Sequence, residues 1–152
     1  MKLPSNLNIK LPNLGRDIGS LAGYQKSRVY YPSNMLAVGT PATIHMWSDT
    51  HAATVQEVVQ TKAGRTYLKV TRDHKKCIKK ATYYGDQPKY EFTPNPEGGE
   101  CWAEVVFFKD DNDELVFMTQ KADFNYKTKR FTKNGWAFVS LGERREYYDP
   151  HF

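Results

Sequence analysis

The chain has 152 residues, of which 39% are hydrophobic and 26% charged, a composition that supports one packed domain and excludes a disordered chain. Lysine and arginine (22) exceed aspartate and glutamate (17), so the net charge is +5, which is compatible with an anionic partner. No apolar run approaches the roughly 18 residues of a membrane span, and the two cysteines lack the CxxC spacing of a zinc site. We therefore expect no membrane partner, no metal and no cofactor.

Residues 1–34 differ from the rest of the chain. Prolines, asparagines and glycines separate isolated leucines, and neither a period of 2 nor one of 3.6 is present. Pro4 and Pro12 each lack a backbone donor and favour an extended preceding residue. Because ordering such a segment costs conformational entropy, the spaced leucines indicate an irregular N-terminal arm that docks on the domain or on a partner. Such an arm could also link subunits into an oligomer.

Residues 35–152 have the pattern of a single β domain. Apolar alternation, interrupted by turns rich in Gly, Pro, Asn and Asp, predicts strands at 41–47, 53–60, 66–72, 101–109, 114–119 and 136–141. The segment 72–80 is compatible with either a strand end or a loop. Short turns between successive strands are typical of a meander. The predicted fold class is therefore mainly β, a small antiparallel SH3-like or related open barrel.

A polar cluster, His45 to His51, covers the end of the first predicted strand and the turn that follows it. At strand spacing His45 and Trp47 share one face, and the turn could bring Asp49 and His51 near them. One interpretation is part of a metal or acid–base site, as in a small metal-dependent phosphodiesterase. The other is a turn in which Ser48 and Asp49 cap backbone groups. A metal site normally needs three or four protein ligands, so the second interpretation is favoured.

Two segments, 69–80 and 121–133, concentrate positive charge. The second interleaves aromatic rings with cations, as surfaces that stack bases and bind phosphates do. The predicted anion-binding patch comprises Lys69, Arg72, Lys75, Lys76, Lys79, Lys80, Lys127, Lys129 and Arg130. The structural alternative is an edge strand protected by lysines, with the rings of 121–133 turned toward the core.

The C-terminal residues from 143 onward are charged and aromatic. Arginine forks suit phosphate or carboxylate, and Arg and Tyr are enriched at binding hot spots. The first and last strands of a small barrel commonly close against each other, so the turn and this tail are expected to share a face. The predicted ligand-binding residues are Trp47, Ser48, Asp49, His51, Arg144, Arg145, Tyr147, Tyr148 and Asp149. Alternatively, both segments are framework, with the tyrosines covering the barrel end.

Three separated elements occur in a characteristic order. They are PATI and WSDTHAATVQEV between 41 and 58, YEFTPNPEG at 90–98, and LGERREYYDPHF at 141–152. Together they resemble a family of small tailed-bacteriophage and prophage proteins, over roughly residues 38–152. The resemblance implies a setting, the host cytoplasm or the virion, and supplies no activity.

The sequence shows no nucleophile, base and orienting group that would converge on one pocket. We therefore predict a non-enzymatic, phage-type accessory protein that binds an anionic ligand, either nucleic acid or a nucleotide. Two alternatives remain open. One is an inhibitor that binds an acidic surface of a host or defence protein, and the other is a virion component held by its N-terminal arm.

Overall fold

The computed structural model describes residues 19–20 and 29–147, so most of the expected N-terminal arm lies outside the described residues. The elements are β1 (Gly19–Ser20), β2 (Tyr31–Pro32), η1 (Ser33–Met35), β3 (Pro41–His45), β4 (Thr50–Gln60), β5 (Thr66–Arg72), β6 (His74–Lys79), β7 (Lys89–Thr93), β8 (Glu100–Lys109), β9 (Leu115–Asn125), β10 (Arg130–Thr132) and β11 (Phe138–Leu141). In this part of the chain no helix is long and apolar enough to cross a membrane.

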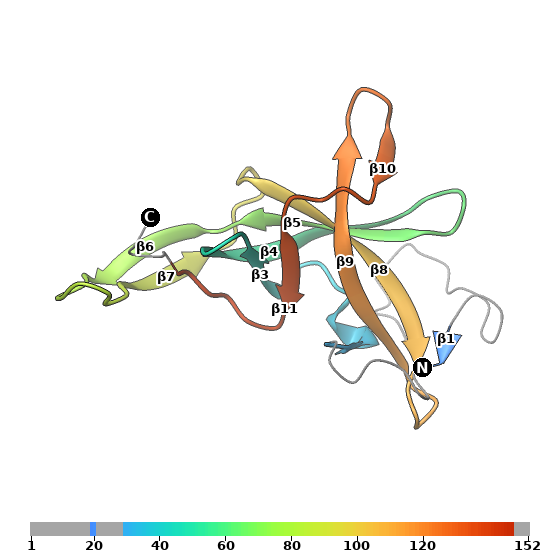
Figure 1. Cartoon of the computed structure of the whole chain (residues 1–152), viewed down its shortest axis with the longest axis horizontal. Helices are drawn as coiled ribbons and strands as arrows, with labels where there is room; N and C mark the ends of the chain where they lie inside the picture. The colour runs from blue at the N-terminus through green and yellow to red at the C-terminus, as the bar shows by residue number, and fades with distance from the viewer. Residues whose placement is uncertain (1–18, 21–28, 148–152) are drawn as a thin grey trace.

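The main sheet is an antiparallel meander that curls toward closure. Strands β3, β4, β5, β8 and β9 follow one another, and β11 returns beside β3, which gives the order β10-β9-β8-β5-β4-β3-β11. Two short strands join outside this path, β1 beside β8 and β2 beside β9. The curl brings β11 next to β9 (Figure 1). The predicted mainly β, antiparallel barrel-like fold is confirmed.

Strand bounds follow the burial pattern. The strand predicted at 66–72 has those bounds, and those predicted at 41–47, 53–60 and 101–109 shift only at their ends. The strand predicted at 114–119 instead continues to Asn125. It does so because β10 folds back along its second half and pairs Phe131 with Phe124.

Side chains complete the seam between β9 and β11, where the barrel closes. The hydroxyl of Thr119 in β9 donates a hydrogen bond of 2.7 Å to the carbonyl of Val139. The amide of Leu141 donates one of 3.2 Å to the hydroxyl of Tyr31 in β2. These contacts satisfy backbone groups of β11 that a further ladder would otherwise pair.

The two faces of the sheet bury different clusters. Leu68 and Phe117 belong to the main core inside the curl, where both are fully buried. Tyr67 and Trp102 point to the other face, where the ring of Phe131 stacks on Tyr67 with 3.8 Å between centroids. Phe124 packs against Trp102 at 5.7 Å. Phe124 and Phe131 thus pack against the sheet, as in the structural interpretation of 121–133, whereas the ring of Tyr126 is exposed.

Strands β6 and β7 form a separate two-stranded sheet, hereafter the β6–β7 arm, residues 74–93. The arm projects from one end of the molecule (Figure 1). Every residue of β6 is exposed. The ambiguous segment 72–80 is thus a strand, but it pairs outside the barrel.

Candidate functional site

The β3–β4 turn and the C-terminal segment meet, as the sequence analysis predicts. The amide of Thr50 donates to the carbonyl of Tyr147 at 3.0 Å, and the amide of Tyr147 donates back to Thr50 at 3.0 Å. Arg145 contributes its amide to the hydroxyl of Thr43 at 3.1 Å. Tyr148 and Asp149 lie outside the described residues. The C-terminal segment thus pairs with the start of β4, but Trp47 lines one hollow, whereas Arg145 and Tyr147 line another.

Arg144 points inward rather than toward a ligand. Its Nε lies 2.8 Å from a carboxylate oxygen of Asp73, whose side chain has no exposed surface. Its Nη2 donates to the hydroxyl of Thr54 at 3.0 Å, and that hydroxyl donates to the same carboxylate at 2.7 Å. Nε and Nη2 of Arg144 thus both contact groups inside the fold, which favours a framework role for this residue.

Glu146 ties the same segment to β4. One of its carboxylate oxygens accepts the amide of Ala52 at 2.9 Å, and the other lies 3.4 Å from Nδ1 of His51 and from Nζ of Lys75. The side chains of His51 and Glu146 are only 6% and 3% exposed. His51 is therefore a buried link between the turn and the tail, and it presents little surface to a ligand.

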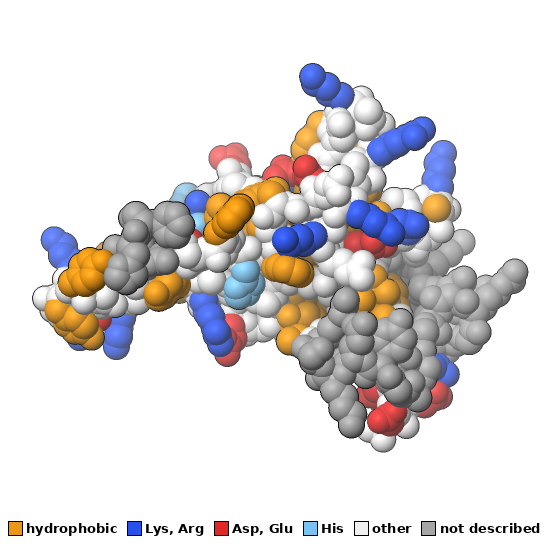
Figure 2. Space-filling view, in the orientation of Figure 1, with side chains coloured by type: hydrophobic (Ala, Val, Ile, Leu, Met, Phe, Trp, Pro, Cys, Tyr) orange, Lys and Arg blue, Asp and Glu red, His pale blue; other side chains and the backbone are white. Residues whose placement is uncertain are grey.

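Trp47 has a different environment, because its side chain is 98% exposed. Trp47 therefore does not fill the core. Trp47 lines a hollow of about 460 Å³ together with the exposed rings of Trp136 and Phe138 and with Lys121. The Lys121 ammonium lies 4.6 Å from the centre of the Phe138 ring. We call these four side chains the aromatic platform; Figure 2 shows hydrophobic and basic side chains adjoining over β11.

Close backbone packing positions the platform. A Cβ built on Gly135 would lie 2.6 Å from the amide nitrogen of Ala122, so only glycine lets the chain before β11 pass so close to β9. Beyond it, Ala137 and Val139 are buried while Trp136 and Phe138 are exposed. Sequence analysis placed these residues on a strand but did not assign Trp136, Phe138 or Lys121 to the site. The available signal was the period-2 alternation of the strand, which places both rings on the same face as the polar Ser140.

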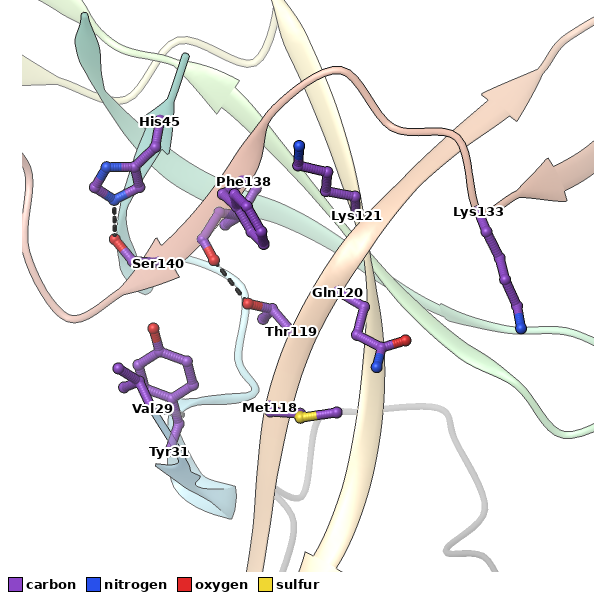
Figure 3. A pocket seen from close by; sticks show the side chains of 11 residues that line it. Val29, Tyr31, His45, Met118, Thr119, Gln120, Lys121, Lys133, Phe138 and Ser140 are labelled. Carbon is purple, nitrogen blue, oxygen red and sulfur yellow. Dashed lines mark hydrogen bonds between the residues drawn. The ribbon is translucent and has the colours of Figure 1, made fainter. Parts of the chain in front are cut away.

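A larger groove of about 830 Å³ continues from the platform along the β9–β11 seam. In Figure 3, His45, Phe138 and Lys121 lie toward one end of the groove, and Val29 and Tyr31 toward the other. A hydrogen bond of 2.7 Å joins Nε2 of His45 to the hydroxyl of Ser140. Burial lowers the pKa of His45 below its ordinary value, and the charge of Arg145 lowers it further. The imidazole is thus held neutral near pH 7.

The two histidines of the turn do not converge. The β3–β4 register pairs His45 with Thr50 and Ile44 with His51, which places the two imidazoles on opposite faces of the sheet. Within residues 19–20 and 29–147 no three His, Cys, Asp or Glu side chains are grouped so that they could hold a metal ion. The geometry therefore gives no support to the metal-dependent phosphodiesterase alternative. The amide of Met46 donates a hydrogen bond of 2.9 Å to the backbone carbonyl of Asp49, which closes the turn that contains Ser48.

The predicted anion-binding residues form two surfaces rather than one. Lys75, Lys76, Lys79 and Lys80 belong to the β6–β7 arm, whereas Lys127, Lys129 and Arg130 surround the β9–β10 turn. These hairpins project in different directions (Figure 1). Between them, Lys69 on β5 lies 3.9 Å from the Glu57 carboxylate, and Arg72 ends β5 with its amide bonded to Gly99.

Comparison of the chain with protein-family models, with curated proteins and with solved structures finds no match. The described residues form a barrel-like antiparallel β domain with an exposed aromatic platform and two basic hairpins.

Proposed function

We propose that the protein binds single-stranded nucleic acid on the aromatic platform. The observation that carries the proposal is the exposure of Trp47, Trp136 and Phe138 around one hollow beside the ammonium of Lys121. Exposed large rings are costly to keep in water, and rings beside cations are the elements with which proteins stack bases and hold a phosphate backbone.

The charge around the platform supports the same ligand. Lys133 lines the same groove as Lys121, and the chain before it forms the β9–β10 hairpin with Lys127, Lys129 and Arg130. These three residues are exposed. A strand whose bases stack on the platform can therefore extend its phosphates toward the β9–β10 hairpin. The interaction is sequence-tolerant, because every base has a stacking face.

Fluorescence anisotropy with a labelled oligothymidylate tests the proposal. We expect Trp136→Ala and Trp47→Ala each to weaken binding roughly tenfold, since stacking contributes about 1–3 kcal/mol per base. Tyr83→Ala is the matched control, because Tyr83 is 71% exposed but lies on the β6–β7 arm. Unchanged affinity in both tryptophan variants, or no binding by the unmodified protein at low salt, would contradict the proposal.

Salt dependence separates this ligand from a protein partner. Phosphate contacts release counterions, so nucleic-acid affinity falls steeply as salt rises. If the protein instead binds a host protein with an affinity that does not change with salt, the inhibitor alternative is favoured.

The bacteriophage setting is part of the proposal and depends on the resemblance of residues 38–152. Mass spectrometry of purified virions distinguishes a virion component from a protein of the host cytoplasm.

A further inference from the structure

The β6–β7 arm has features that the platform does not use. It pairs with no strand of the main sheet, and an isolated two-stranded hairpin is marginally stable in water. Side-chain contacts nevertheless stabilise the arm at its base and at its tip. At its base Lys75 lies 3.4 Å from the Glu146 carboxylate and 5.0 Å from the centre of the Tyr90 ring. At its tip the carboxylate of Asp86 accepts the amide and the hydroxyl of Thr82 at 2.9 and 3.1 Å.

Three of the lysines of the arm lie on one face. The arm carries five lysines, at positions 75, 76, 79, 80 and 89, against two acidic residues, Asp86 and Glu91. The register pairs Lys76 with Glu91 and Lys79 with Lys89. Because residues 89 and 91 share a face, Lys76, Lys79 and Lys89 do so too. Figure 2 shows Lys and Arg side chains around this end of the molecule.

The other face of the arm is aromatic. Lys75 pairs with Phe92 and Cys77 with Tyr90 across the ladder, so these residues lie opposite the lysine face. Tyr90 and Phe92 also line a groove of about 630 Å³ that the arm forms with the C-terminal segment at Arg145 and Tyr147. The arm therefore has an aromatic face, with Tyr90 and Phe92, and a basic face, on which Lys76, Lys79 and Lys89 lie with Glu91.

We propose that the arm binds double-stranded nucleic acid by lying in a groove of the duplex with its basic face toward the phosphates. A two-stranded β ribbon fits the major groove, which is about 12 Å wide. With the lysines directed at the phosphates, which carry no direct sequence information, the binding is expected to be independent of sequence. This inference goes beyond the proposed function, because it concerns another surface and another form of nucleic acid.

Titration of a mixed-sequence 20-base-pair duplex over a range of salt concentrations tests the inference. In the variant Lys76→Ala with Lys79→Ala we expect affinity for the duplex to fall at least tenfold. We also expect the slope of log K against log salt to become shallower by about 2, close to one for each lost phosphate contact. The matched control is Lys62→Ala with Arg65→Ala, which removes two exposed cations from the β4–β5 turn.

Three outcomes would overturn the inference: no duplex binding by the unmodified protein, an equal loss in the control pair, or unchanged affinity in the arm variant. Circular dichroism shows whether each variant is folded, and the substituted side chains are exposed. Protection of guanine N7 from methylation locates the arm in the major groove, and unprotected N7 with intact affinity would exclude that groove. Trp136→Ala should leave duplex binding unchanged, so failure of this inference is distinguishable from failure of the platform.

Discussion

Two neighbouring arginines that look alike in the sequence have opposite roles in the structure. Arg144 is paired with the fully buried carboxylate of Asp73, whereas Arg145 pairs with Glu143 and both of these side chains are 65% exposed. Removing Arg144 leaves a buried charge without its partner. We expect Arg144→Ala to lower the free energy of unfolding by about 3 kcal/mol, or roughly 10 °C in Tm. Arg145→Ala should cost less than about 1 kcal/mol.

Thermal and urea unfolding of both variants measure this difference. A second change tests the cause: adding Asp73→Asn to Arg144→Ala removes the unpaired charge but keeps an acceptor for the Thr54 hydroxyl. Part of the lost stability should return in the double variant. Equal stabilities of the two arginine variants would show that Arg144 is not a framework residue.

His45 makes stability depend on pH. Its pKa is lowered in the folded protein, from an ordinary value of 6.5, by burial and by Arg145. The unfolded chain therefore takes up a proton more readily than the folded one as the pH falls. The stability that neutral His45 contributes is present above its ordinary pKa and is lost as the pH falls below it.

We expect Tm to fall less in His45→Gln than in the unmodified protein between about pH 7.5 and about pH 5.5. The glutamine side chain cannot titrate but can still bond to Ser140, which is the present partner of His45. The two proteins differ at no other position, so the difference between the two pH profiles isolates position 45. Parallel profiles would contradict the assignment.

Among the elements, β9 and β11 meet at a seam that side-chain hydrogen bonds hold together. Tyr31→Phe removes the hydroxyl that accepts the amide of Leu141, which is buried. We expect it to cost about 1–2 kcal/mol and to speed hydrogen exchange at Leu141. The adjacent Tyr30 is the control, because its buried hydroxyl has no hydrogen-bond partner among the described residues. Tyr30→Phe should therefore be neutral, and a comparable loss in both variants would contradict the role of the seam.

The barrel strands could be predicted from the sequence because they bury one face or both. The run 66–72 alternates and is flanked by turns, and its predicted bounds are the observed ones. The β6–β7 arm could not be predicted in the same way, since all of β6 is exposed and carries no apolar alternation.

The candidate site could be predicted from the sequence only in part, for a similar physical reason. The proximity of the turn and the tail followed from barrel closure. The pairing of Arg144 with Asp73 did not, because these residues are 71 positions apart and their contact depends on how β5 and the C-terminal segment pack. Alternation places Trp136 and Phe138 on one face of their strand but does not show that this face is exposed, and the hollow they share with Trp47 requires the β3–β11 pairing.

On the scale of the whole molecule, contacts between the two ends of the described domain close the fold. The hydroxyl of Thr43 donates to the carbonyl of Glu143, 100 residues later, at 2.7 Å. Because β3 pairs with β11, the barrel is complete only when the C-terminal segment has docked. Residues in the main core should then become accessible through opening of the entire barrel rather than through local fluctuation.

Cys101 allows a direct measurement of this cooperativity. Its side chain lies in the main core, and burial raises the pKa of its thiol to about 12, so little reactive thiolate forms at neutral pH. Cys77, on the arm, is exposed. A thiol reagent should therefore label one cysteine per chain at once and the second only as the barrel opens. Cys77→Ser should abolish the fast phase alone.

In the Cys77→Ser protein, Arg144→Ala should accelerate labelling of Cys101 by the factor that corresponds to its loss of stability. Labelling through an opening equilibrium follows the population of the open state. Rapid labelling of Cys101 in the Cys77→Ser protein, without a matching loss of stability, would show that the core opens locally and that the barrel is not one cooperative unit.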